Sequence, residues 1–249
     1  MLKIQILLVT IFFSPSLRAS TSDYSKLAYI DQTIFFGLGV SYSKLETYTN
    51  IGNYFVVSQT NPRLDFRYVS KVEEDFRYYW HMYYVREKFA AENPNLSIIN
   101  NQDLNRYGLA YKPHWFTEGK GFSYGLNFKI KQANFYSAVP TPSLLYGEIK
   151  QRLSYQVGGS FKWYGQTLTK LPVSLDLDFS YVNHFTQNAD FDYGEGFNYS
   201  MALDFDFGRR SYFTNYNLRF FYENEKIQTD LRPFVEKELG FTVAKAISF

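Results

Sequence analysis

Apolar and polar residues alternate along nearly the whole chain from Ile34 onward, and this period-two pattern constrains the fold more than any other feature. In the segment 122–131, aromatic and aliphatic residues occupy the even positions, whereas serine, glycine, asparagine and lysine occupy the odd ones. Such alternation is typical of a β-strand with one apolar and one polar face. About ten segments of this kind follow one another, each roughly 11–16 residues long, although globular strands average only about 5–6. The pattern therefore predicts an all-β chain with long strands.

The composition limits where the apolar faces can go. Phe, Trp and Tyr make up 20% of the 249 residues, yet the mean hydropathy is −0.31, so apolar and polar residues are finely interleaved. A tilted strand needs about 9–11 residues to cross the hydrocarbon layer of a membrane. A transmembrane barrel turns its apolar faces to lipid and encloses its polar faces. A soluble exported barrel of lipocalin type would carry apolar residues inside. The charged residues on the second face of the predicted strands argue against that class.

The expected connections alternate between short and long. Short ones are expected near 73–75, 117–121, 165–172 and 208–211, and longer ones near 47–62, 90–103, 137–148, 187–194 and 223–233. Short turns on one side and long loops on the other are typical of transmembrane barrels. Because an unpaired strand edge in lipid has no water to bond, the sheet must close. We therefore predict a closed antiparallel up-and-down transmembrane β-barrel of about ten strands, with eight and twelve as alternatives.

The N-terminus has the features of a secretory signal peptide. Lys3 precedes an apolar run from Ile4 to Phe13, and Ala19 offers a small residue for cleavage. This run is too short to span a bilayer as a helix. We predict a signal peptide over 1–19 and a single barrel domain over 20–249. With no cysteine and a net charge of only +2, the composition excludes disulfides and argues against nucleic acid as a partner.

The signal peptide, the alternating strands and the closing segment 240–249 together resemble the bacterial outer-membrane β-barrel proteins of Gram-negative cells. In that family the last strand ends in phenylalanine and is read by the barrel-insertion machinery. The resemblance implies that Gly240, Ile247 and Phe249 belong to this insertion signal. It also implies residence in the cell outer membrane, with membrane lipid and lipopolysaccharide as further partners. Lys245 departs from the pattern, because it falls on the lipid-facing parity.

The inward parity carries two sets of charges that are expected to lie on opposite walls of the lumen. The basic wall consists of Arg63, Arg67, Arg77, Arg106, Lys129, Lys131, Arg152 and Lys162. The acidic cluster consists of Asp176, Asp178, Asp204 and Asp206. If the hairpin between the two acidic strands turns near Phe191, Asp176 lies beside Asp206 and Asp178 beside Asp204. Directly opposed like charges destabilise a sheet, so bases from across the lumen or a bound cation must compensate them.

Three interpretations of this lumen remain open. The charges form ion pairs that fill a structural or surface-interaction barrel, or they line a narrow porin-like channel, or the aspartates bind a metal or perform catalysis. A separate alternative is an outer-membrane hydrolase of peptide or lipid at the rim, where His184 would act as a base with Asp190, Asp192 or Glu195. Because the chain has no recognisable nucleophile, metal or phosphate motif, we predict no catalytic residue, metal or cofactor.

Overall fold

The computed structural model describes residues 31–49, 52–91, 96–98, 103–117, 121–140, 145–166, 171–185, 194–207, 215–228 and 233–249. Ten long strands form a closed ring, which confirms the predicted barrel and its strand number. These strands are β1 (Thr33–Thr49), β3 (Asn61–Val69), β4 (Phe76–Glu87), β7 (Leu104–Phe116), β8 (Phe122–Pro140), β9 (Leu145–Gln166), β10 (Pro172–His184), β11 (Glu195–Phe207), β12 (Tyr216–Gln228) and β13 (Pro233–Ser248). The predicted signal peptide lies outside the described residues. In the described part of the chain, no helix is long and apolar enough to cross a membrane.

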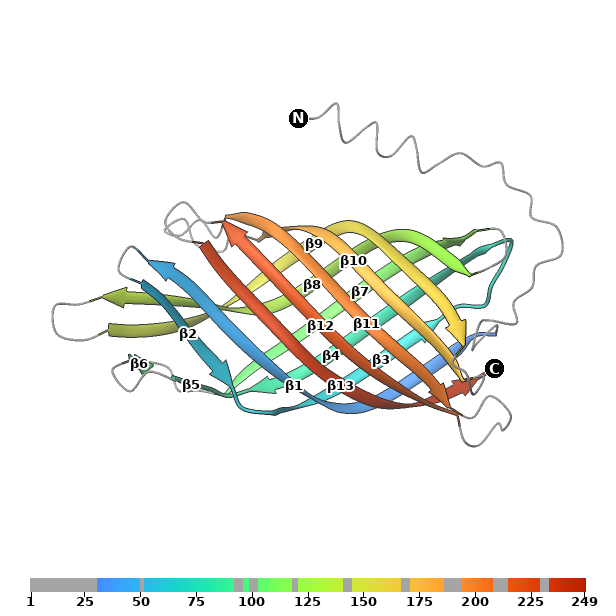
Figure 1. Cartoon of the computed structure of the whole chain (residues 1–249), viewed down its shortest axis with the longest axis horizontal. Helices are drawn as coiled ribbons and strands as arrows, with labels where there is room; N and C mark the ends of the chain where they lie inside the picture. Colours follow the sequence, from blue (N-terminus) through green and yellow to red (C-terminus); the bar gives the residue numbers. More distant parts are fainter. Residues whose placement is uncertain are drawn as a thin grey trace, which may run out of the picture.

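The ring closes where the first strand meets the last. β1 and β13 pair antiparallel from Thr33 opposite Ser248 to Thr47 opposite Phe234. Every other pair of neighbours in the ring is also antiparallel and consecutive among the ten long strands. β1 begins and β13 ends at the same end of the barrel, here called the terminal end (Figure 1). The opposite end, which carries the β8–β9 hairpin, is called the distal end.

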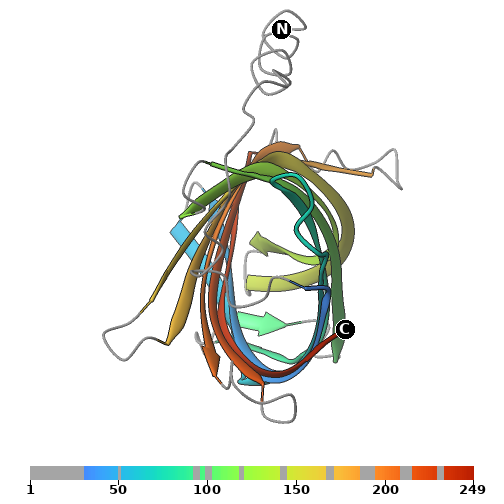
Figure 2. The same cartoon turned by 90° about the vertical axis from the view of Figure 1, so that its right-hand side faces the viewer.

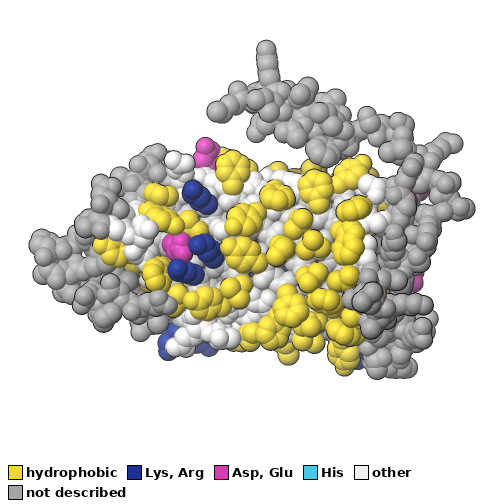
Figure 3. Space-filling model, in the orientation of Figure 1, with side chains coloured by type: hydrophobic (Ala, Val, Ile, Leu, Met, Phe, Trp, Pro, Cys, Tyr) yellow, Lys and Arg dark blue, Asp and Glu magenta, His cyan; other side chains and the backbone are white. Residues whose placement is uncertain are grey.

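The apolar strand faces point outward. Leu38, Leu109, Phe179 and Phe220 are between 42 and 68% exposed, whereas the polar residues between them along each strand are buried inside the ring. Figure 3 shows the resulting belt of hydrophobic side chains around the wall. Lys245 follows the same parity and is exposed, and its register with β1 is continuous, so the strand has no bulge there.

The distal end differs from the prediction, because strand replaces much of the expected loop. β12 continues to Gln228 and β13 begins at Pro233, so most of the predicted link 223–233 is a hairpin. The expected link 137–148 is likewise a hairpin, since β8 reaches Pro140 and β9 begins at Leu145. Charged residues favoured a loop for the stretch 223–233, yet 223–228 keeps the alternation of buried and exposed side chains and pairs with β13.

Three short strands lie at the distal end, beside β1 and β9. β2 (Gly52–Ser58) pairs with the end of β1, β5 (Phe89–Ala91) pairs with β2, and β6 (Leu96–Ile98) pairs with β9. They lie in or next to the long links predicted near 47–62 and 90–103. The distal parts of β8 and β9 fold over the mouth of the barrel: β8 contacts β1, and the end-on view shows both strands inside the outline of the ring (Figure 2).

Candidate functional site: the lumen

The alternation of the strands directs twenty charged side chains into the lumen. Among the described residues, ten are basic and ten are acidic, so the interior is balanced in charge. The basic ones are Arg63, Arg67, Arg77, Arg106, Lys112, Lys129, Lys131, Arg152, Lys162 and Arg219. The acidic ones are Asp65, Glu87, Asp176, Asp178, Asp204, Asp206, Glu223, Glu225, Glu236 and Glu238. The glutamates lie in the distal half of the lumen and the aspartates in the terminal half.

In the distal half, Arg106 on β7 joins three strands. Its guanidinium lies 3.0 Å from Glu87 on β4, and 3.2 and 2.6 Å from Glu236 and Glu238 on β13. Arg63 on β3 also reaches Glu238, at 2.8 Å. A planar guanidinium can serve several carboxylates at once because it offers five donors. These contacts connect opposite walls of the barrel through its interior.

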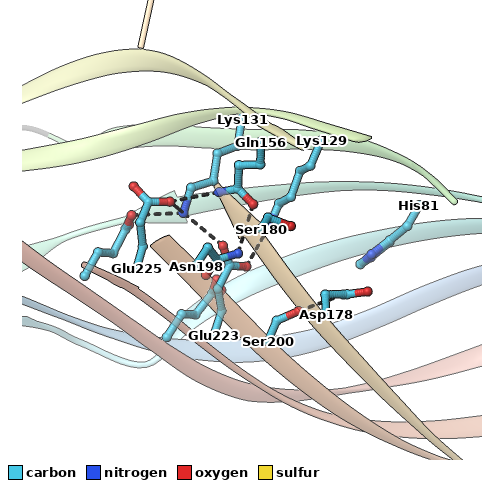
Figure 4. A network of polar contacts seen from close by, with 12 residues as sticks. His81, Lys129, Lys131, Gln156, Asp178, Ser180, Asn198, Ser200, Glu223 and Glu225 are labelled. Atoms are coloured by element: carbon cyan, nitrogen blue, oxygen red, sulfur yellow. Dashed lines mark hydrogen bonds and ion pairs between the residues drawn. The ribbon is translucent and has the colours of Figure 1, made fainter. Parts of the chain in front are cut away.

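Lys131 on β8 is the second centre of the distal network. Its ammonium lies 2.9, 2.7 and 3.1 Å from Glu223, Glu225 and Glu236. Arg152 reaches Glu225 at 2.6 Å, and the amide of Gln156 donates to the same carboxylate. Figure 4 shows Lys131, Gln156, Glu223 and Glu225 converging from β8, β9 and β12. These ion pairs cross the lumen and connect β8 and β9 with β12 and β13.

Above the distal network lies an apolar layer, here called the distal plug. Its eight side chains are each at most 4% exposed: Leu45, Val56, Phe89, Phe135, Tyr136, Ile149, Ile227 and Phe234. The β8–β9 hairpin contributes Phe135 and Tyr136, and the ring of Phe135 lies 4.8 Å from that of Phe234 on β13. A dense apolar layer excludes water, because filling it with water would leave that water without hydrogen-bond partners.

In the terminal half, the four predicted aspartates come together, but in a different register. Asp176 faces Ala202, Asp178 faces Ser200 and Asp204 faces Ser174. The predicted pairs Asp176–Asp206 and Asp178–Asp204 are therefore wrong. The observed register places small residues opposite the carboxylates and so avoids directly opposed like charges, which destabilise a sheet.

Bases from across the lumen and from the neighbouring strand β12 compensate these carboxylates. Lys112 lies 2.6 Å from Asp178 and 3.3 Å from Asp176. Asp204 accepts hydrogen bonds from Arg67 at 2.8 Å and from Arg219 at 2.9 Å. Among the described residues, no group of three or more potential ligands is arranged to hold a metal ion. Asp176, Asp178 and Asp204 therefore serve as acceptors for arginine and lysine, whereas Asp206 accepts a hydrogen bond from Asn217.

Each of the eight predicted basic residues lies in the lumen, as do the four aspartates. Sequence reasoning missed Arg219 as a partner of the aspartates, and it missed the five buried glutamates. Four of these glutamates lie in the stretch 223–238, which was read as a loop and the start of the last strand. The signal was nevertheless present, since Glu223 and Glu225 share a parity, and Glu236 and Glu238 share another.

The residues of the hydrolase hypothesis are separated by the wall. His184 is 6% exposed and points inward, whereas Glu195 is exposed and accepts a hydrogen bond from the outward-facing Tyr181. Asp190 and Asp192 lie outside the described residues. His81 bonds to Asp65 at 2.7 Å and His114 to Ser123 at 2.9 Å, both inside the barrel. Glu195 is thus no partner for His184.

The predicted insertion residues lie on β13 and at the chain end. Ile247 and Phe249 are exposed on the outer face, 48 and 65% respectively. The backbone amide of Phe249 donates to the carbonyl of Gln32, which ties the terminus to the start of β1. Gly240 pairs with Ser41 and Phe221, and a Cβ at this position would lie 2.3 Å from the carbonyl oxygen of Val40. The glycine is therefore required for close approach of the two strands.

The closed ring, the outward apolar belt and the charged interior define the class of outer-membrane β-barrel proteins. The outer membrane protease OmpT of Escherichia coli has a similar structure, with 7% identity, a TM-score of 0.52, and coverage of 88% of this chain and 97% of that one. An outer-membrane channel from Pseudomonas putida F1 aligns over 94% of this chain and 99% of its own, with 9% identity and a TM-score of 0.49. No protein-family model and no curated protein sequence matches the chain. The comparisons thus identify a fold and not an activity.

Proposed function

We propose that this chain is an outer-membrane barrel with an occluded lumen, which serves as a structural and surface-interaction protein and not as a porin-like channel. The observation that carries the proposal is the distal plug, stacked on the balanced ion-pair network. In this proposal the terminal end faces the periplasm and the distal hairpins face the cell exterior. This orientation follows the general arrangement of such barrels, with short turns inside and longer extensions outside.

The size of the barrel supports occlusion. An eight-strand barrel is just wide enough for side chains to fill its interior, and ten strands widen it only modestly. Two cavities lie in the lumen, of about 70 and 50 Å³, and each has room for only a few water molecules. Neutral pairing also removes the net field that would make a narrow pore selective. A basic wall opposite an acidic wall therefore holds this barrel together from inside.

The charged surface beyond the apolar belt supports a contact with lipopolysaccharide. Lys44 and Lys237 face outward on β1 and β13, and their ammonium groups lie 3.0 and 3.1 Å from Glu46 between them. Figure 3 shows charged side chains next to the distal edge of the belt. Two lysines share a single carboxylate in this cluster, which leaves positive charge for lipid phosphates. The proposed partners of the outer surface are membrane lipid and lipopolysaccharide.

Planar-bilayer conductance tests the occlusion. The refolded full-length protein is expected to show no stable conductance steps, because water does not pass the plug. Replacing Phe135, Tyr136 and Phe234 together by alanine removes three rings from the plug and is expected to produce steps. Phe220→Ala is the matched control, since it removes a ring from the lipid-facing surface. Stable steps in the unaltered protein that change size in Lys131→Gln would instead establish a channel.

A further inference from the structure

The larger lumen cavity lies at the terminal end of the barrel, apart from the distal plug. It has a volume of about 70 Å³ and is lined by residues near the ends of β4, β9, β10, β11 and β12. Aromatic rings of Phe35, Tyr79 and Tyr164 form part of its wall. Charged side chains of both signs form the rest, among them Lys162 and Asp206. A half-enclosed site with apolar walls and a few convergent polar groups is the usual form of a small-ligand site.

Lys162 has unused hydrogen-bonding capacity in this cavity. Its ammonium is 4.0 Å from Asp176 and 3.9 Å from Asp204, beyond hydrogen-bond distance, and it makes no hydrogen bond to any described residue. It lies over the ring of Tyr79, 5.1 Å from the centroid. Lys112 in the same half of the lumen instead donates to Asp178 at 2.6 Å. The ammonium of Lys162 is therefore available to an added carboxylate.

Asp206 is the complementary group. Its Oδ1 accepts a hydrogen bond from Asn217 at 2.7 Å, and the residue is buried, with 7% of its surface exposed. No basic group among the described residues comes within 4.0 Å of this carboxylate, whereas Asp65, Asp176, Asp178 and Asp204 each have such a partner. A buried carboxylate without a cation is costly, because burial removes its hydration. An added ammonium would relieve that cost.

Lys162 and Asp206 line the same cavity and do not pair with each other. Asp204 and Asp206 lie two residues apart on one face of β11, which separates them by roughly 7 Å. Since Lys162 is 3.9 Å from Asp204, Asp206 lies farther along the cavity from the ammonium. In an α-amino acid, the nitrogen and the carboxyl carbon are roughly 2.5 Å apart. With a charge-assisted hydrogen bond of about 2.8 Å at each end, such a molecule connects an ammonium and a carboxylate that lie up to about 8 Å apart.

We propose that this cavity binds a small zwitterion of the α-amino-acid class, with its carboxylate on Lys162 and its ammonium on Asp206. A zwitterion keeps the charge balance of the lumen, which a lone anion or cation would break. Tyr79, Tyr164 and Phe35 provide the surface for a small apolar side chain. The site is separate from the distal plug, so its occupancy does not depend on whether the lumen conducts.

Calorimetric titration of the refolded full-length protein in detergent tests the site with alanine as the probe. Alanine is expected to bind with a Kd below about 1 mM. Acetate and methylammonium each carry one of the two charges and are expected to bind at least about tenfold more weakly, a factor equal to about 1.4 kcal/mol. No binding of alanine up to about 1 mM, or equal binding of acetate, would overturn the proposal.

Variants give a second measurement on the same protein. Lys162→Gln and Asp206→Asn are each expected to weaken alanine binding at least about tenfold, since each removes one charge partner. Asn at 206 can still accept the hydrogen bond from Asn217, which favours correct folding of that variant. Lys226→Gln is the matched control, because it removes an exposed lysine from the outer face of β12. Alanine affinity that is unchanged in both lumen variants would contradict the assignment.

Discussion

At the scale of single residues, the neighbouring glycines 158 and 159 on β9 show how tightly the wall is built. A Cβ at Gly158 would lie 1.9 Å from the carbonyl oxygen of Phe179 on the adjacent β10, whereas a Cβ at Gly159 would meet only the ring of Phe161, at 3.9 Å. The first glycine allows two strands to approach, and the second lies on the outer face. The two positions therefore differ in their tolerance of a side chain, although they are adjacent in sequence.

Gly158→Ala is expected to destabilise the barrel by about 1–3 kcal/mol, the usual cost of forcing atoms into a packed site. Gly159→Ala serves as its control and is expected to leave the stability within about 0.5 kcal/mol. Urea unfolding of both variants in lipid vesicles measures the difference. Equal stability of the two variants would show that the strands separate at Gly158 without cost.

The sequence predicted which residues point inward, because parity alone decides the side of a strand. For this reason it identified eight of the ten described basic residues of the lumen and four of its five aspartates. The partners of these residues were harder to predict. Register depends on the turn between β10 and β11, and an error in that turn moved the expected partner of Asp176 from Ala202 to Asp206. Contacts across the lumen depend on the closed shape of the barrel, and the parity of a residue does not determine that shape.

At the scale of elements, the ion pairs of Arg106 connect strands that are not neighbours in the ring. Arg106 on β7 contacts Glu87 on the adjacent β4 but also Glu236 and Glu238 on β13, across the lumen. Its side chain is 1% exposed. Removing one partner of a buried ion pair leaves uncompensated charge in the interior.

Arg106→Met is expected to lower the free energy of unfolding by about 3–5 kcal/mol, since three buried carboxylates lose their shared cation. Arg86→Met is the matched control, because Arg86 is 63% exposed and pairs with Asp103 on the surface. That surface pair is worth about 0–1 kcal/mol. Unfolding by urea at neutral pH compares them, and equal losses would mean that the Arg106 cluster contributes no more than a surface pair.

The sequence predicted the long strands well in the belt and poorly at the distal end. In the belt, aromatic residues make the alternation plain. Beyond it, the outward face of β12 turns polar at Asn224 and Lys226, so both faces carry polar residues and the stretch resembles a loop. The distal plug escaped prediction for a different reason. Its apolar residues come from β1, β2, β5, β8, β9, β12 and β13, and only the folded chain brings them together.

At the scale of the whole molecule, the barrel has an apolar exterior and a charged interior, the reverse of a soluble globular protein. Its aromatic residues are surrounded by lipid, where those of a soluble protein would pack in a hydrophobic core. Inside the barrel, ion pairs across the lumen take the place of such packing. The distal plug is the exception, because there the apolar side chains turn inward where the strands leave the belt. This division of the molecule accounts for both its fold and its proposed occlusion.

Site-directed spin labelling tests this division most directly, and the absence of native cysteine makes single labels unambiguous. Labels at Leu38→Cys, Leu109→Cys and Phe179→Cys are expected to collide freely with oxygen dissolved in the bilayer and rarely with an aqueous nickel complex. Labels at the inward positions Ser154→Cys and Ala202→Cys are expected to be shielded from both. Outward labels that meet the nickel complex but not oxygen would contradict the account, as would inward labels freely reached by nickel.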